Sequence, residues 1–107
     1  MSRHQAEKIT KAYAQALEKN RFKFENMYLF GSRAIGRENC ESDIDIAVIA
    51  KRPWRGGAYL SQKMKLWTIA AEVDARIEPV LLAPTDLKKD TVSIIGDQVR
   101  RYGIRVR

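Results

Sequence analysis

Residues 28–48 read YLFGSRAIGRENCESDIDIAV and join a glycine-serine pair to two aspartates. The aromatic and apolar residues just before Gly31 are typical of a short buried strand, which the glycine ends. Further on, Asp43 and Asp45 alternate with aliphatic residues. A strand over residues 43–49 would therefore place both carboxylates on one face and the aliphatic side chains on the other. The stretch predicts a strand, a turn and a second strand that carries two acids.

Helical periodicity is present on both sides of this stretch. Apolar residues recur every three or four positions over residues 3–20, which predicts a helix with one buried face. A second helix is predicted after the loop at 51–57, which contains proline and glycine, and a third between 85 and 103. The second helix has one apolar stripe that we expect to face the core: Leu60, Met64, Trp67 and Ala71.

A third strand, predicted over residues 76–82, contains a glutamate. Pro79 removes one backbone donor from the ladder, which favours an edge strand or a bulge. Glu78 precedes it within an apolar run, a setting that only Asp43 and Asp45 share among the acidic residues. Glu78 is therefore the candidate third carboxylate, with an exposed position on an edge strand as the alternative.

The order of these segments predicts an α/β or α+β fold, with a small mixed sheet of three or four strands flanked by helices. The order of the strands cannot be read from the sequence. A length of 107 residues fits one domain, 1–107, because two cores would each be too small. The single cysteine, Cys40, cannot close a disulfide within the chain.

The charge balance indicates an anionic partner. Twenty Lys and Arg residues against 13 Asp and Glu give a net charge of +7, which would suit nucleic acid, a triphosphate or an acidic protein. The basic residues do not form a continuous block, so charge alone does not choose among these. No apolar run is long enough to span a bilayer and the first residues are polar, so we expect a cytoplasmic protein without a membrane partner.

The two aspartates predict a metal site. Alternate residues on one strand face lie about 6–7 Å apart, which allows two carboxylates to bracket a hard divalent cation. Unpaired carboxylates in a half-buried sheet would repel each other and lose solvation. Magnesium, as a pair of ions, is the expected ligand of Asp43 and Asp45.

The glycine-serine pair predicts a phosphate site. Gly31 allows close approach of an anion, and Ser32 would offer a hydroxyl beside free amides at the start of a short helix. Arg33 is either a further phosphate contact or a solvated helix charge. A triphosphate held here and bridged to metal ions would undergo in-line displacement at its α-phosphorus, with pyrophosphate as the leaving group.

These motifs resemble a known signature. Gly31-Ser32-Arg33-Ala34, Gly36 and Ser42-Asp43-Ile44-Asp45-Ile46 resemble the pattern of the DNA polymerase β-type nucleotidyltransferase superfamily, over residues 24–82. Within it, the short chain is most similar to the minimal nucleotidyltransferases, many of which are prokaryotic antitoxins encoded beside a HEPN-domain toxin. The family often has arginine where this chain has Ile35, and commonly aspartate where it has Glu78.

The resemblance implies site residues and an activity. Asp43, Asp45 and Glu78 would be the catalytic metal ligands, and Gly31 and Ser32 would hold the triphosphate of ATP. The antitoxin branch implies transfer of AMP to a tyrosine hydroxyl of a HEPN toxin, within a homo- or hetero-oligomer. Two alternatives stay open: a catalytically inactive module of the same fold that binds a partner protein, and a small basic domain that binds nucleic acid.

Overall fold

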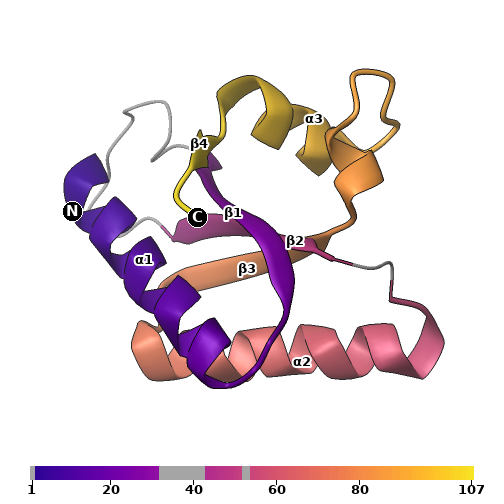
Figure 1. Ribbon diagram of the computed structural model, residues 1–107. Coiled ribbons are helices and arrows are strands. Elements are labelled where there is room, and N and C mark those ends of the chain that lie inside the picture. The colour runs from indigo at the N-terminus through magenta and orange to yellow at the C-terminus, as the bar shows by residue number, and fades with distance from the viewer. Residues whose placement is uncertain (1, 32–42, 52–53) are drawn as a thin grey trace.

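The computed structural model describes residues 2–31, 43–51 and 54–107. Three helices and a mixed four-stranded sheet make up this part of the chain (Figure 1). The elements follow in the order α1 (Arg3–Lys19), β1 (Phe24–Phe30), β2 (Ile44–Ala50), α2 (Gly56–Val73), β3 (Ile77–Leu82), the 3₁₀ helix η2 (Pro84–Leu87), α3 (Ile94–Tyr102) and β4 (Ile104–Arg105). The expected mixed sheet flanked by helices is confirmed.

The sheet has the strand order β3-β2-β1-β4. β1 runs antiparallel to both β2 and β4, whereas β2 and β3 run parallel. β3 lies at an edge, which confirms the expectation from Pro79. The last residues, for which no strand was predicted, supply the opposite edge, where Ile104 is opposite Leu29.

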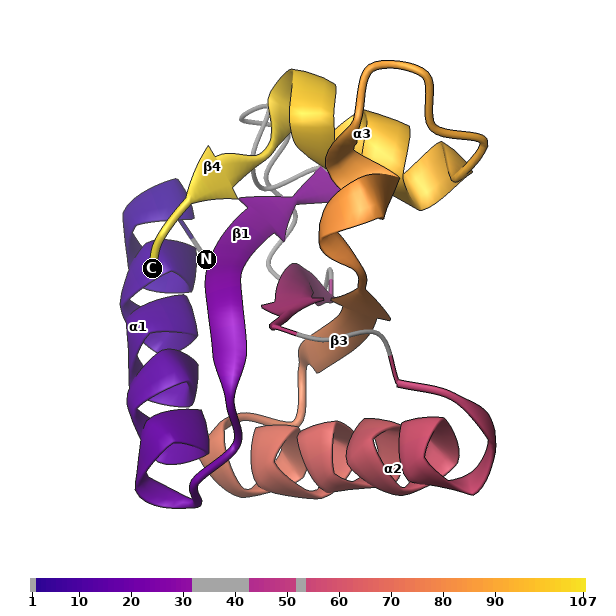
Figure 2. The ribbon, with the colours of Figure 1, turned by 45° about the vertical axis from the view of Figure 1, so that its right-hand side comes forward.

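Each face of the sheet has its own core. Alternate residues of β1, β2 and β3, such as Leu29, Ile46 and Leu81, pack in the larger cluster with α1 and α2. The residues between them pack in a smaller cluster with Val99 of α3. Figure 2 shows α2 along the bottom and α3 at the top, with the sheet between them. Residues from Ile46 to Ala50 are all buried because β2 is covered on both faces.

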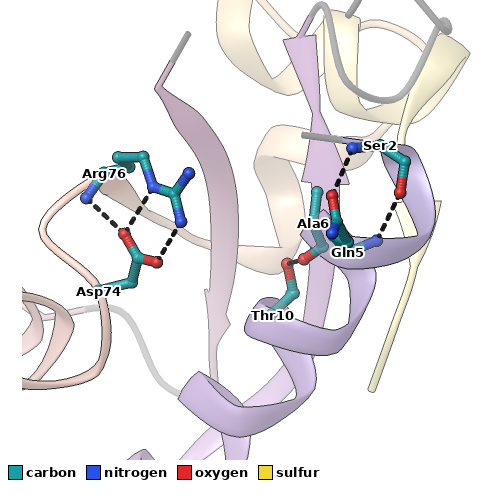
Figure 3. Close-up of polar contacts among 6 residues, drawn as sticks. All are labelled: Ser2, Gln5, Ala6, Thr10, Asp74 and Arg76. Atoms are coloured by element: carbon teal, nitrogen blue, oxygen red, sulfur yellow. Dashed lines mark hydrogen bonds and ion pairs between the residues drawn. The ribbon is translucent and has the colours of Figure 1, made fainter. Parts of the chain in front are cut away.

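Helix α1 is capped at both ends. Ser2 and Gln5 form a reciprocal capping box, and Thr10 donates to the carbonyl of Ala6 at 2.7 Å (Figure 3). At the other end, the amides of Arg21 and Phe22 donate to the carbonyls of Glu18 and Leu17 at 3.0 and 2.9 Å, which is a Schellman motif.

Arg21 occupies the position of this motif that glycine usually fills. Its φ of 60° lies in the left-handed region, which costs an L-residue with a side chain about 1–2 kcal/mol. Phe22, the next residue, is buried in the α1–α2 core together with Leu17. The buried Phe22 therefore holds the turn closed although Arg21 is strained.

The sequence-based orientation of α2 is wrong. Leu60, Met64 and Trp67, expected in the core, are 58%, 63% and 44% exposed, and Ala71 is exposed as well. The buried face carries Leu66, Ile69 and Ala70 instead, and the Leu66 carbonyl accepts a hydrogen bond from Tyr13 at 2.9 Å. Periodicity identified the helix, but the helix has two apolar stripes, and the sequence did not show which of them is buried. Among the described residues, none of the helices combines the length and hydrophobicity needed to cross a bilayer.

Candidate active site

Two of the expected acids are neighbours in the sheet. The parallel register of β2 and β3 pairs Asp45 with Glu78, and the antiparallel register of β1 and β2 pairs Asp45 with Phe30. Paired residues of adjacent strands lie about 4.8 Å apart and point to the same face. Asp43 comes just before β2 and is exposed. Acids separated by 33 residues of sequence, Asp45 and Glu78, therefore meet at one end of the sheet.

This acidic cluster, defined as Asp43, Asp45 and Glu78, lies on the face that α3 covers. Ala47 and Ile49, which follow Asp45 at alternate positions of β2, belong to the α3-side core. Asp45 and Glu78 are nevertheless half-buried, because they lie at the strand ends where that core stops. Their carboxylates are anchored by buried strands and still reachable from solvent.

Gly31 lies directly against this cluster. It follows β1, with a φ of 75° that side chains rarely adopt. A methyl group placed on its Cα would overlap the carboxylate of Asp45. Gly31 was expected to allow close approach of a bound anion, and the anionic group that lies against it here is the Asp45 side chain.

The pKa values of Asp45 and Glu78 are both raised. Burial is the main reason that the pKa of Asp45 is raised, and repulsion from Asp43 adds to it, whereas a hydrogen bond with Glu78 opposes the shift. Burial likewise raises the pKa of Glu78, followed by hydrogen bonding with Asp43 and repulsion from both aspartates. Burial and the neighbouring carboxylates therefore both favour the neutral form of Glu78 relative to an isolated glutamate.

The donor chemistry fits a divalent cation. Carboxylate oxygens are the ligands that Mg²⁺ prefers, and a cation would remove the repulsion between carboxylates that adds to the effect of burial on these pKa values. In residues 2–31, 43–51 and 54–107, no group of three or more His, Cys, Asp or Glu side chains is already arranged around a metal position. The cluster fits a cation by charge and donor type, without a preformed centre.

A salt bridge beside the cluster was missed from the sequence. Asp74 and Arg76, in the turn between α2 and β3, form a bidentate pair with contacts of 2.7 and 3.0 Å (Figure 3). The Arg76 guanidinium lowers the pKa of Asp74. The Arg76 carbonyl also accepts the amide of Ile44 at 2.8 Å, which ties this turn to the start of β2. The Asp-x-Arg spacing was the only sequence signal for it.

Two expected phosphate contacts, Ser32 and Arg33, lie outside the described residues, as does the short helix predicted after them. Gly31 is the only member of the expected phosphate site in the described part of the chain. It brings the end of β1 to the acidic cluster. Gly31 and Asp43, the described residues on either side of residues 32–42, therefore both lie at the candidate site.

Sequence comparison relates the chain to enzymes that transfer nucleotides. The model of the family described as polymerase beta, nucleotidyltransferase, matches residues 7–95, which include Gly31 and all three acids. A Methanocaldococcus jannaschii protein named as a protein adenylyltransferase is 31% identical over 84 residues. These residues are 78% of this chain and 80% of the relative.

Structure comparison agrees with the sequence. A Sulfolobus solfataricus protein named as a nucleotidyltransferase is similar with a TM-score of 0.64 and 17% identity, over 96% of this chain and 80% of that one. A chain from a toxin–antitoxin complex with AMP-PNP is similar with a TM-score of 0.58 and 28% identity. The match covers 88% of this chain and 68% of that one. A chain from the complex of the tri-AMPylated Shewanella oneidensis HEPN toxin with MNT antitoxin is similar with a TM-score of 0.55 and 24% identity. The match covers 98% of this chain and 71% of that one. At 17% and 24% identity, the first and third of these share only the fold.

Proposed function

The chain belongs to the polymerase beta nucleotidyltransferase family, and on this basis we propose that it is a magnesium-dependent protein adenylyltransferase that acts as an antitoxin. It transfers AMP from ATP to a tyrosine hydroxyl of a HEPN-type toxin. The observation that carries the proposal is the meeting of Asp45, Glu78 and Gly31 from three adjacent strands. The relative named as a protein adenylyltransferase supports the acceptor class.

Each residue of the site has a proposed role. Asp43, Asp45 and Glu78 would hold two Mg²⁺ ions, which would supply positive charge to the triphosphate and to the leaving pyrophosphate. Gly31 keeps the backbone clear of the Asp45 carboxylate, so that Asp45 stays in reach of a cation. Gly31, Ser32 and Arg33 hold the phosphates.

In the reaction, the acceptor oxygen forms a bond to the α-phosphorus of ATP while the bond to the bridging oxygen of the β-phosphate breaks. Pyrophosphate leaves and the hydroxyl proton is released to water. Asp45 and Glu78 are held at fixed spacing by the register of two buried strands, so little ordering is needed when ATP binds. The rigid sheet provides orientation, and the acids provide the charge.

The exposed apolar face of α2, defined as Leu60, Met64 and Trp67, supports a protein partner. These large side chains follow each other at helical spacing and are 44–63% exposed. Aromatic and Met side chains are enriched at protein interfaces. The structural relatives include a complex of a HEPN toxin with an MNT antitoxin, and we propose that a HEPN toxin is the class of partner that binds this face.

The activity is tested by transfer of label from α-labelled ATP with Mg²⁺ to a co-expressed HEPN-type partner. We expect label on a partner tyrosine with the wild type and none with Asp43→Asn plus Asp45→Asn. Asp90→Asn, an exposed acid outside the site, is the matched control and should retain transfer. Folded protein that labels no partner with any nucleotide would instead favour the inactive partner-binding module.

The partner surface is tested separately. Leu60→Asp plus Met64→Asp should prevent co-purification of the partner while the fold is kept, because both side chains are exposed. The control pair Lys63→Asp plus Glu72→Lys changes exposed α2 residues outside the apolar face. Co-purification that survives the first pair would exclude this face as the interface without affecting the proposed chemistry.

A further inference from the structure

A basic cavity lies at the end of the sheet opposite the acidic cluster. Its volume is about 520 Å³, and it is lined by Arg21, Lys23, Lys51, Trp54, Gln62 and Lys65. Arg21 and Lys23 precede β1 and Lys51 follows β2, whereas Gly31 follows β1 and Asp45 is the second residue of β2. Six residues of extended chain separate Asp45 from Lys51, which is roughly 20 Å. An anion bound here would be well away from the carboxylates.

Among the described residues, no carboxylate is paired with a cation of this cavity. In the described part of the chain, neither Arg21, Lys23, Lys51 nor Lys65 takes part in an ion pair, while Arg76, Arg100 and Arg107 each do. The Lys65 ammonium donates to the Asn20 carbonyl at 3.0 Å, which holds its charge at the cavity. Four like charges held around one hollow create a positive potential that attracts an anion.

The positive surface continues beyond this cavity. A second hollow of about 490 Å³ shares Arg21, Lys23 and Lys51 with the first, so the two form one trough. Two carboxylates line this second hollow, Glu18 and Glu25, and Glu18 is paired with Arg107. The strongest attraction for an anion is therefore in the first hollow, which no carboxylate lines among the described residues.

Two local features favour a ligand at this place. Arg21 stands in a left-handed position suited to glycine, so its charge is retained at a cost to the fold. Trp54 lines the cavity, is half-buried, and within the described residues its indole Nε1–H has no hydrogen-bond partner. The buried Nε1–H is out of reach of a ligand in the cavity, so the contribution of Trp54 is its aromatic ring, which lines the same cavity as the Arg21 side chain.

We propose that this trough, centred on Arg21, Lys23, Lys51 and Lys65, binds the phosphate backbone of a single-stranded nucleic acid. A positively charged groove with an aromatic side chain in its wall is the usual form of a single-strand site. Three of the four cations are lysines, which are depleted at protein–protein interfaces, so a nucleic acid fits better than an acidic protein. The trough is independent of the transferase activity and uses none of its residues.

The test measures anisotropy of a labelled oligouridylate of about 12 nucleotides across a series of salt concentrations. The variant with Arg21→Gly plus Lys51→Ala should bind at least tenfold more weakly. The plot of the logarithm of the association constant against the logarithm of the salt concentration should become less steep by about 1.4, since each lost phosphate contact removes about 0.7 from the slope. The control pair Lys8→Ala plus Lys89→Ala removes the same charge from exposed sites elsewhere. Equal weakening in both pairs would overturn the proposal, because binding would then follow net charge.

A second set of measurements separates strand binding in the trough from loss of fold and from binding of a different anion. Arg21→Gly alone should weaken binding while the protein unfolds at a higher temperature, which rules out loss of fold as the cause. In a Trp67→Phe background, the emission of Trp54 should change when the oligouridylate is added. Unchanged emission, or displacement by polyglutamate at an equal charge concentration, would contradict a nucleic-acid site. Displacement by millimolar ATP with no length dependence for the oligouridylate would contradict a strand and indicate a free nucleotide.

Discussion

The two ends of β2 carry groups of opposite charge that are built in different ways. At its start, Asp45 is paired with Glu78 on a neighbouring strand, and burial raises the pKa values of both. Beyond its end, Lys51 joins Arg21 and Lys65 from loops and a helix around an open hollow. Short acids on rigid strands create repulsion that a compact cation can relieve. Long basic side chains around a trough suit an extended anion instead.

The largest expected effect is on adenylyl transfer, which should depend on the acidic end of β2 and not on the basic end. Asp45→Asn should lower adenylyl transfer about a thousandfold, because it removes a proposed metal ligand. It should also abolish the rise in melting temperature caused by Mg²⁺ with ATP. Lys51→Ala should retain both adenylyl transfer and the rise in melting temperature, since Lys51 lies beyond the far end of β2. An Asp45→Asn protein that still responds to Mg²⁺ and ATP would remove Asp45 from the metal site.

Substitution of Gly31 should give the next largest effect, on stability. Gly31→Ala combines a left-handed backbone with overlap of the Asp45 carboxylate, and we expect a loss of about 1–3 kcal/mol in the free energy of unfolding. Gly57→Ala is the control, because a methyl group there meets open space on a helix and should not destabilise. Thermal unfolding in chelator measures both. Adding Asp45→Ala should recover part of the loss; no recovery would mean that the overlap is unimportant.

Arg21 gives a smaller change of opposite sign at the basic end. Arg21→Gly should raise the free energy of unfolding by about 1 kcal/mol, because glycine adopts the left-handed turn without strain. Arg21→Ala removes the same charge but keeps the strained backbone, so it should not give this gain. Chemical denaturation of the three proteins measures the difference. An equal gain from both substitutions would assign the effect to charge instead of backbone strain.

The smallest effect is a dependence of stability on pH. Asp45 and Glu78 have pKa values raised in the folded state, so their contribution is fully present below the unfolded values of about 4 and is lost as pH rises through the raised values. In chelator, wild-type protein should therefore lose stability relative to Glu78→Gln as pH rises from 4. Melting temperatures of both proteins over this range measure the difference, and parallel curves would contradict it.

Asp74 provides the opposite sign within the same protein. Arg76 lowers its pKa, so the contribution of this pair is present above the unfolded pKa and is lost as pH falls through the folded one. Asp74→Asn should therefore reduce the acid sensitivity of wild-type protein. If Asp74→Asn and Glu78→Gln change the pH dependence of stability in opposite directions, the acidic cluster, and not acids in general, opposes folding in the absence of metal.

The sequence predicted the strands well because their patterns are local. The alternation of acids and aliphatics located β2 to within one residue at each end, and Pro79 indicated that β3 lies at an edge. The strand order and β4 were not predictable. β4 has only two residues, and only pairing with β1 makes them a strand.

The faces of the helices were predicted less well. In α2, the stripe with Trp67 and the stripe with Leu66 have similar sequence periodicity, and only contact with Tyr13 and the sheet selects the second as buried. The basic trough was not predictable at all. Arg21, Lys51 and Lys65 are far apart in sequence and were seen only as a dispersed positive charge.

The sequence by itself determined the chemistry available to this protein: a glycine-serine pair, two aspartates on one strand, a glutamate beside a proline, and an excess of positive charge. These depend on residue type and short spacing, which are local properties, although Asp43 itself lies just before β2 and only Asp45 lies within it. The tertiary structure alone decided that Glu78 lies opposite Asp45, that Gly31 touches Asp45, and that four cations meet at the opposite end of the sheet. Such contacts depend on strand register and on packing between distant segments, which no local pattern contains.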